Sequence, residues 1–306
     1  MKKFLVLLTS VLLLTVLVAC GTSDDSESGG DESLNPDKLV MGFVPSQDSD
    51  TIVETVEPLA ERLGEILGKE IEARTMTNYN ALVEGMGAQT VHIGFIPAFG
   101  YVIANEDYDV EVILKSIRDG EATYKAQYLV HKDSGIESLE DLEGKVWAYG
   151  DPTSTSGFLF PASHLMTEFG IESQEELTTE FFSDAYQTGG HDNSAIAVYD
   201  GDADVATTFD DVRDTLVEDY PDIKDQLVVL GYTDEIPNDT ISVIKELDDD
   251  LVDEIREAFL SFNDDEEMIE VMNEVYNWDA IDEAEHADYE VVAETYNRFR
   301  DSVSLD

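Results

Sequence analysis

The sequence predicts an α/β protein built from two lobes, each an open, mostly parallel sheet flanked by helices. Short apolar runs, typical of buried strands, alternate along the chain with longer stretches whose apolar residues keep helical spacing. This alternation starts near residue 38 and starts again after residue 138. The length of 306 residues accommodates two such units.

The first series alternates strands and helices up to residue 117. Its first strand is the apolar run 38–44, and Ser49 or Asp50 can cap the helix that follows. Gly68 ends that helix, and Asn78 can cap the next one. The expected strands are 38–44, 71–75, 91–96 and 110–117, and the expected helices are 49–67, 79–86 and 98–105.

The second series begins with a strand of alternating character at 124–131. A last strand at 241–243 returns to the first lobe, because residues 249–306 carry an almost entirely helical pattern. The other expected strands are 146–149, one near Phe181, 205–208 and 227–230, with helices up to Phe169 and over 193–199.

These elements divide the chain into one lobe from 38–129 plus 238–306 and another from 130–237. The crossings are expected where the strand ends near His131 and within 231–239. Two lobes joined by more than one crossing leave a cleft, and open α/β sheets place ligands at the carboxyl ends of their strands.

The amino terminus has the form of a secretory signal. Lys2 and Lys3 precede an apolar stretch that is short for a membrane span, so residues 1–19 are expected to be removed. The next residue is Cys20, the only cysteine, in a setting that resembles a bacterial lipobox. We expect a lipid on Cys20 and a flexible acidic linker over 20–37.

Charge and cysteine content exclude several classes of function. The chain has 69 Asp and Glu against 17 Lys and Arg, a formal charge of −52, which argues against binding nucleic acid or an anionic membrane surface. One cysteine makes neither an internal disulfide nor a Cys-based zinc site.

The strongest chemical signal is a run of three hydroxyls, Ser154, Thr155 and Ser156, between an expected strand and an expected helix. The first N–H groups of a helix lack internal partners and carry partial positive charge. Gly157 lets the backbone come close to a ligand. The run therefore predicts a site for a small tetrahedral anion that needs no Lys or Arg, although a simple helix cap explains the same residues.

Two further candidates lie at comparable places. His191 follows two glycines just before an expected helix and can donate a hydrogen bond to an anion. Asp210 follows the strand 205–208 and would accept a hydrogen from a P–OH group or an ammonium, while repelling a fully ionised sulfate. A zinc site at His191 and Asp192 is a weak alternative, because no other histidine has ligand spacing to them.

Two tyrosines complete the predicted site. Tyr79 and Tyr101 each stand early in a helix after a strand of the first lobe, and a phenol can donate to an oxyanion while its ring excludes water. The segment 95–99 between them is apolar and favours a small substituent on the ligand. Glu180 and Asp184 are candidates for a second acidic residue, beside Asp210, that would bind an amine.

Taken together, these segments resemble the substrate-binding lipoproteins of phosphonate, phosphite and phosphate ABC importers. The resemblance is carried by 39–45, 79–83, 93–97, Ser138 to Leu142, 154–157, His191 and 202–210. It implies a two-lobed, hinged type II periplasmic-binding-protein fold. It also implies that the ligand is held by Tyr79, Tyr101, Ser154, Thr155, Ser156, His191 and Asp210.

The implied function is capture of a small phosphorus oxyanion by lobe closure and delivery to ABC permease subunits. No catalytic step, cofactor or metal is expected. The protein would be a monomer, held by its N-terminal lipid on the outer face of the cytoplasmic membrane. Two alternatives stay open: the same fold carrying a sulfonate or a vitamin precursor, and a secreted hydrolase that uses Ser154 and His191.

The acidic composition also generates a prediction about salt. A formal charge of −52 destabilises the folded state by self-repulsion, which dissolved salt screens. The melting temperature should therefore rise from low salt to about 1 M NaCl. We infer from the charge that the protein is adapted to a saline environment, and a melting temperature that stays level or falls over this range would contradict that hypothesis.

Overall fold

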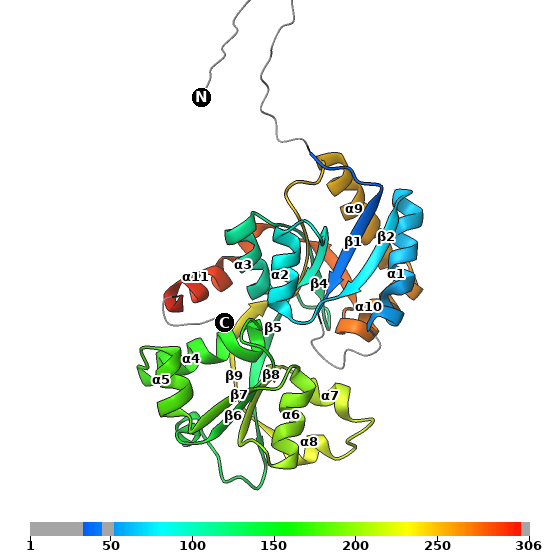
Figure 1. Ribbon diagram of the computed structural model, residues 1–306. Helices are drawn as coiled ribbons and strands as arrows, with labels where there is room; N and C mark the ends of the chain where they lie inside the picture. Colours follow the sequence, from blue (N-terminus) through cyan, green and yellow to red (C-terminus); the bar gives the residue numbers. More distant parts are fainter. Residues whose placement is uncertain (1–32, 45–51, 301–306) are drawn as a thin grey trace, which may run out of the picture. The chain divides into compact units, whose positions relative to one another are not determined.

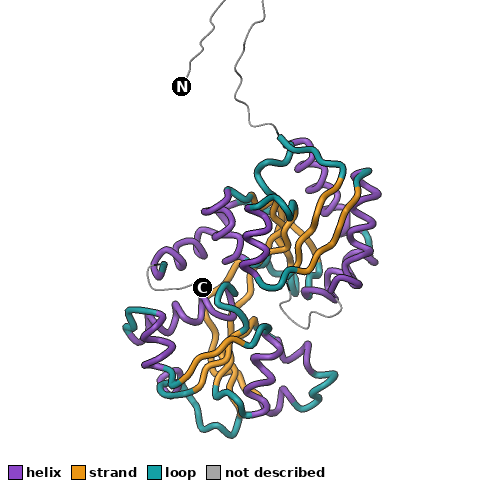
Figure 2. Tube along the Cα trace, in the orientation of Figure 1, coloured by secondary structure: helices purple, strands orange, loops and turns teal. Residues whose placement is uncertain are grey.

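The computed structural model describes residues 33–44 and 52–300, and these form two mixed sheets with helices on both sides (Figures 1 and 2). In the first sheet the strand order is β11-β4-β10-β3-β1-β2. Its strands are β1 (Lys38–Phe43), β2 (Glu70–Thr75), β3 (Ile93–Ile96), β4 (Glu111–Ile117), β10 (Thr240–Val243) and β11 (Ala280–Glu283). Strands β1, β2 and β3 are parallel, whereas β10 and β11 pair with their neighbours in antiparallel fashion.

The second sheet has the order β7-β6-β8-β5-β9. Its strands are β5 (Thr123–His131), β6 (Val146–Tyr149), β7 (Asp184–Gln187), β8 (Val205–Phe209) and β9 (Leu227–Pro237). Here β6, β7 and β8 are parallel, and the long strands β5 and β9 run antiparallel. Each sheet is therefore mixed, because β10 and β11 in the first sheet and β5 in the second run against the remaining strands.

Helices cover both faces of each sheet (Figure 1). In the first lobe they are α1 (Ile52–Leu67), α2 (Tyr79–Gly87), α3 (Ala98–Tyr108), α9 (Asp249–Ser261), α10 (Glu266–Tyr276) and α11 (Glu290–Phe299). In the second lobe they are α4 (Phe160–Phe169), α5 (Gln174–Glu176), α6 (His191–Asp200), α7 (Val212–Leu216) and α8 (Ile223–Gln226). None of the helices in the described part of the chain has the length and apolar character needed to span a membrane.

Short helical turns complete the architecture. Three are 3₁₀ turns: η1 (Leu139–Leu142), η4 (Phe262–Asp264) and η5 (His286–Tyr289). Two are π-helical turns: η2 (Thr155–Leu159) and η3 (Leu177–Phe181). The strand predicted near Phe181 is wrong, because the Phe182 amide donates to the Leu177 carbonyl and closes this turn, and the strand β7 starts only at Asp184.

The second lobe has an aromatic core around Trp147 of β6. The Trp147 ring stacks on Phe158 with centroids 5.4 Å apart and packs against Phe182 at 5.1 Å. Its indole N–H donates to the Thr207 hydroxyl of β8 at 2.8 Å. The same Thr207 hydroxyl donates to the carbonyl of Gly157 in η2, so these two hydrogen bonds fix η2 relative to the neighbouring strands β6 and β8.

The chain passes between the sheets at two places. The first is the segment between β4 and β5, which contains a left-handed turn at Asp119 and Gly120, and the second is Asn238 and Asp239 between β9 and β10. The predicted crossing near His131 is wrong, because that residue pairs with Leu227 inside the second sheet. The lobe boundary therefore lies before Thr123 rather than after residue 129.

The end of the predicted linker also differs from expectation. Residues 1–32, which include the predicted signal and Cys20, lie outside the described residues. By contrast, the last linker residues are bound to the first lobe: Leu34 forms a β-bridge with Leu247, and Lys69 donates to the Asn35 side chain at 2.5 Å. The last residues of the predicted linker are therefore part of the first lobe.

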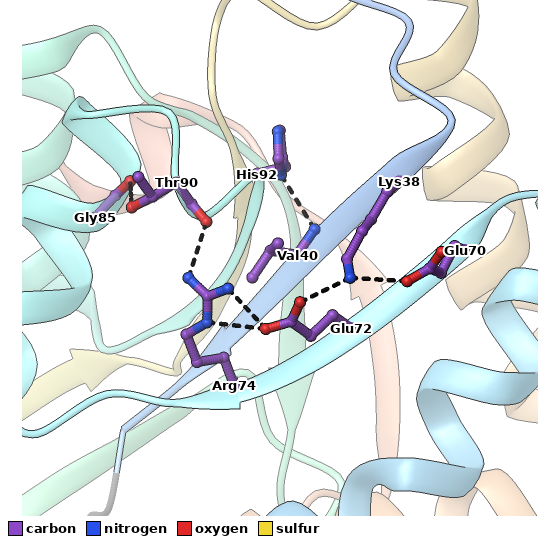
Figure 3. Close-up of polar contacts among 8 residues, drawn as sticks. All are labelled: Lys38, Val40, Glu70, Glu72, Arg74, Gly85, Thr90 and His92. Carbon is purple, nitrogen blue, oxygen red and sulfur yellow. Dashed lines mark hydrogen bonds and ion pairs between the residues drawn. The ribbon is translucent and has the colours of Figure 1, made fainter.

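Charged side chains pair along the edge strand β2 (Figure 3). Lys38 lies 2.7 Å from Glu70 and 3.0 Å from Glu72, and Arg74 lies 2.6 Å from the same Glu72. Beside them, the Val40 amide donates to the ring of His92 at 3.1 Å. Exposed ion pairs contribute only about 0–1 kcal/mol each. Charged side chains on an edge strand also discourage that strand from pairing with a strand of another chain.

One buried side-chain amide adds to the backbone hydrogen bonds, Ser116 to Asp239 and Asn238 to Ala122, that join the two passages. The Asn238 side chain donates to the carbonyls of Ser116 at 3.0 Å and Glu121 at 2.8 Å, and so ties the second passage to the first. Asn238→Ala should lower the free energy of unfolding by about 1–3 kcal/mol, because the Ser116 and Glu121 carbonyls each lose a hydrogen bond, although the Glu121 carbonyl keeps the one from the Arg118 amide. Urea unfolding measures this change.

The exposed Asn297 on α11 provides the matched control. Asn297→Ala should change the free energy of unfolding by no more than about 0.5 kcal/mol. Equal effects of the two substitutions would show that the Asn238 amide does not hold the passages together.

Candidate functional site

A small cavity lies between the two sheets, with walls contributed by both lobes. Its volume is about 30 Å³. The first lobe contributes mainly aromatic and apolar side chains, and the second lobe contributes hydroxyls and a histidine. The lining residues are Val44, Tyr79, Phe95, Ile96, Pro97, Arg118, Tyr124, Ser154, Thr155, Ser156, His191, Phe209, Asp239, Tyr276 and Trp278.

The predicted hydroxyl run lines this cavity at the start of a helix. After β6 the chain turns, and Ser154 caps η2 by accepting a hydrogen bond from the Gly157 amide at 3.0 Å. Ser154, Thr155 and Ser156 are all buried, and η2 continues directly into α4. Helix starts leave N–H groups without internal partners and favour negative charge. This wall is therefore suited to an anion.

Glycine is required at position 157 by close packing. A Cβ atom there would lie 2.8 Å from the Ser154 hydroxyl and 3.3 Å from the His191 ring. Any larger residue would displace the Ser154 hydroxyl, because Cβ atoms essentially never come within 3.0 Å of another atom. It would also crowd the His191 ring.

Thr155 also joins the two lobes. Its hydroxyl accepts a hydrogen bond from the Phe99 amide, at the start of α3, at 2.9 Å. Two helix starts, one from each lobe, therefore meet at a single oxygen atom. Since that oxygen accepts from Phe99, the hydroxyl hydrogen is left to donate elsewhere.

His191 is the first residue of α6 and lies beneath the hydroxyl run. Its Nε2 atom is 3.4 Å from the Ser154 hydroxyl, and its ring packs edge-to-face on Phe209 with centroids 5.0 Å apart. Burial, helped by the nearby positive charge of Arg118, lowers the pKa of His191 to about 3. At neutral pH the ring is therefore uncharged and donates from only one nitrogen. Its Nδ1 atom has no hydrogen-bond partner among the described residues.

Only one of the two predicted tyrosines lines the cavity. Tyr79, at the start of α2, lines the cavity, and burial, with Asp239 nearby, raises its pKa well above the usual value. Tyr101 does not reach the cavity, which corrects the prediction. Its ring packs on Tyr289 with centroids 5.0 Å apart, and its hydroxyl bonds to the His286 ring at 2.8 Å. A different tyrosine, Tyr124 of β5, lines the cavity instead.

The predicted carboxylate is also replaced by another one. Asp210 follows β8 as expected, but its backbone N–H donates to the Lys125 carbonyl at 2.9 Å. Its side chain lines a second, larger cavity of about 540 Å³ instead of the small one. The carboxylate of the small cavity is Asp239, from the second passage between the sheets. Burial raises the pKa of Asp239, while Arg118 and the Trp278 indole lower it.

Two more residues of the cavity lack any sequence signal. Trp278 follows α10, is fully buried and stacks on Phe95 with centroids 5.5 Å apart. Its N–H has no hydrogen-bond partner of normal geometry among the described residues. Arg118 brings a positive charge into the cavity, so the expectation of an anion site free of Lys and Arg is wrong.

The remaining candidates do not converge on the cavity. Glu180 and Asp184, proposed for gripping an amine, are exposed and line none of it. In the described part of the chain, no group of three or more His, Cys, Asp and Glu side chains could hold a metal ion.

The lowered pKa of His191 has a consequence for stability. The unfolded chain takes up a proton on this ring below about pH 6.5, whereas the folded chain does not until about pH 3, so folding stability is lost as the pH falls. Between about pH 7.5 and about pH 5 the loss should be roughly 2 kcal/mol. His191→Gln cannot titrate, so the stability difference between wild type and variant should shrink by that amount in urea unfolding. An unchanged difference would mean that the ring titrates normally in the folded protein.

Comparison with known proteins identifies the group to which this architecture belongs. A family model described as "ABC transporter, phosphonate, periplasmic substrate-binding protein" matches residues 41–289. The phosphate-import protein PhnD of Mycolicibacterium smegmatis is 29% identical over 246 residues, covering 79% of this chain and 76% of that protein. The phosphonates-binding periplasmic protein of Escherichia coli is 25% identical over 259 residues, covering 83% and 72%.

A solved structure gives the same result for the fold. The structure of PhnD1 from Prochlorococcus marinus in complex with methylphosphonate superposes with a TM-score of 0.75 at 20% identity, covering 86% of this chain and 98% of that one. The predicted two-lobed type II periplasmic-binding-protein fold is thereby confirmed. The chain belongs to the family of periplasmic substrate-binding proteins of phosphonate ABC transporters.

Proposed function

We propose that this protein captures a small phosphorus oxyanion, such as phosphate, phosphite or methylphosphonate, between its two lobes and delivers it to an ABC permease. The observation that carries the proposal is the buried run Ser154 to Ser156 at a helix start, which lines the same small cavity as Asp239. Several donors together with a single carboxylate fit an anion that retains one hydroxyl.

The donors are almost all neutral. Hydroxyls of the helix start, two phenols whose pKa values are raised by burial, and an uncharged His191 can each give a hydrogen bond to an oxyanion. Neutral donors cost less to bury than cations, and a low-dielectric site strengthens their bonds. Such a site can bind an anion inside a strongly acidic protein.

Asp239 supplies selectivity against fully ionised anions. An ionised carboxylate can only accept, so it requires a hydrogen on the ligand. Phosphate and monoprotonated phosphonates carry a P–OH hydrogen, whereas sulfate carries none. Sulfate would therefore place two acceptors against each other in a buried site, which is unfavourable.

The names of the relatives support a phosphorus oxyanion without fixing which one. One relative is described as a phosphate-import protein, and a protein of the same fold was solved with methylphosphonate. The apolar wall of Phe95, Ile96 and Pro97 leaves little polar surface for an organic substituent. This favours the compact members of the class over a sulfonate or a vitamin precursor.

The geometry around Ser154 supports binding over catalysis. Ser154 and His191 lie 3.4 Å apart, as a nucleophile and a base would. However, the Ser154 oxygen already accepts the capping hydrogen bond from Gly157. Nor does the His191 Nδ1 atom meet an orienting carboxylate within the described part of the chain. The serine hydrolases of this type orient the histidine through a carboxylate on its other ring nitrogen, and that group is missing at His191 among the described residues.

The proposal includes an anchor and a motion. A lipid on Cys20 would hold the protein on the outer face of the membrane, and the linker would let the body move. The lobes would close about the two passages, at 118–122 and at Asn238 and Asp239, by a hinge rotation.

The test is a ligand panel measured in high salt. Phosphate, phosphite or methylphosphonate should raise the melting temperature of the wild type, by an amount equivalent to about 2.7 kcal/mol at a concentration of 100 Kd, and sulfate should not. Asp239→Asn should weaken these ligands by about 10-fold or more and strengthen sulfate, because a charged hydrogen bond is lost and an acceptor repulsion is relieved. Calorimetric titration measures both.

Asp210→Asn is the matched control. It removes the same charge just outside the small cavity and should leave the preference over sulfate unchanged. If Asp210→Asn alone alters the preference, the carboxylate is wrongly assigned. If none of the phosphorus oxyanions stabilises the wild type, the proposed function is wrong.

A further inference from the structure

Arg118 lies at the junction of two cavities. It lines both the small cavity of about 30 Å³ and the acidic cavity of about 540 Å³, and Tyr124 and Phe209 do the same. These three side chains are the only ones that the two linings share, so they form the wall between the cavities. We call Arg118, Tyr124 and Phe209 the neck.

The arginine is held in the neck by aromatic rings. Its guanidinium carbon lies 4.9 Å from the centre of the Phe209 ring and 5.5 Å from the centre of the Tyr124 ring. A guanidinium over an aromatic face is attracted by the electrons of the ring, and this attraction grows when the pair is shielded from water. The two rings thus hold the half-buried guanidinium at the neck.

Arg118 is used differently from most other basic residues. Lys38, Arg74 and Lys115 are each within 4.0 Å of a carboxylate, as are several more. Within the described part of the chain, Arg118 forms no such ion pair. Its charge still acts over a longer range: burial raises the pKa of both Asp210 and Asp239, and the charge of Arg118 opposes that rise. A cation in this position can meet a bound anion.

The larger cavity behind the neck is strongly acidic. Six carboxylates line it: Asp119, Glu121, Asp210, Asp211, Asp214 and Asp279. A ligand tail that ended in an ammonium group would be attracted there. To reach it from the small cavity, however, the tail would have to pass the neck that Arg118 fills.

We propose that Arg118 determines the specificity of the site by plugging the neck, so that the protein accepts compact oxyanions and rejects aminoalkyl phosphonates. This inference rests on the proposed function and extends it to the size of the ligand. The guanidinium binds the anion by charge, and the bulk of the side chain closes the way to the acidic cavity. Removing that bulk should open a ready-made site for an ammonium tail.

The experiment compares methylphosphonate with 2-aminoethylphosphonate by calorimetric titration in molar salt. The wild type should bind methylphosphonate at least 30-fold more tightly than 2-aminoethylphosphonate, because excluding the aminoethyl tail corresponds to about 2 kcal/mol of binding free energy. Arg118→Ala should bind methylphosphonate more weakly, yet the ratio of the two dissociation constants should narrow at least tenfold. Circular dichroism checks that the variant is folded.

Two further variants separate bulk from charge. Arg118→Met keeps a long side chain without a charge, so both ligands should weaken while their ratio stays within about threefold of the wild type. Lys132→Ala removes one charge from an exposed site outside both linings and should change neither constant.

The outcomes are distinct. If the wild type binds methylphosphonate but binds 2-aminoethylphosphonate equally well, or if Arg118→Ala leaves the ratio unchanged, the plug is refuted and the proposed function stands. If Arg118→Met narrows the ratio as much as Arg118→Ala does, exclusion arises from charge and the plug is again refuted. If the wild type binds neither these ligands nor phosphate, the proposed function itself fails.

Discussion

The hydrogen bond from the Phe99 amide to the Thr155 hydroxyl is the contact on which the site depends. It brings the start of α3 in the first lobe against the start of η2 in the second. Helix starts normally repel each other, since both carry partial positive charge. Here the threonine oxygen lies between them and accepts from Phe99, so that the hydroxyl run of the second lobe is held against the first lobe where Ile96 and Pro97 line the cavity.

The acidity of the chain constrains how this site can work. An anion approaching a protein with a formal charge of −52 meets repulsion, so the site must gain its affinity at short range. Buried neutral donors provide this, and the rings of Tyr124 and Phe209 hold one guanidinium at the cavity without an ion pair to any described carboxylate. Arg118 and Asp239 together leave the cavity close to neutral. The cavity can therefore bind an anion although the protein as a whole is strongly acidic.

Much of this architecture could be predicted from the sequence, because its signals are local. The Ser154 to Ser156 run follows an apolar strand and precedes a helix, and the structure places all three residues in the cavity wall. Tyr79 follows a good capping residue, Asn78, whose side chain accepts from the Ala81 amide at 2.8 Å. Strand β11 escaped prediction because only Ile281 of its four residues is buried, so it forms no apolar run.

The residues that the sequence did not indicate are those that tertiary structure alone brings together. Arg118 and Asp239 come from the two passages between the sheets, where no periodic pattern exists, and Trp278 follows a helix end. Asp210 was correctly placed after a strand. Its backbone pairing with Lys125, however, directs the side chain to the other side of the neck. A sequence pattern marks where a strand ends, but it does not show to which side of the sheet the next side chain turns.

The two tryptophans give the protein a built-in optical sensor. Trp147 is fully buried in the core of the second lobe with its N–H bonded to Thr207, and it does not line the cavity. Trp278 is in the cavity wall with an N–H that has no partner of normal geometry in the described structure. Since the chain contains only these two indoles, any change in emission on filling the cavity comes from one of them, while the other acts as an internal reference. The occupancy of the site can therefore be followed in the unlabelled protein.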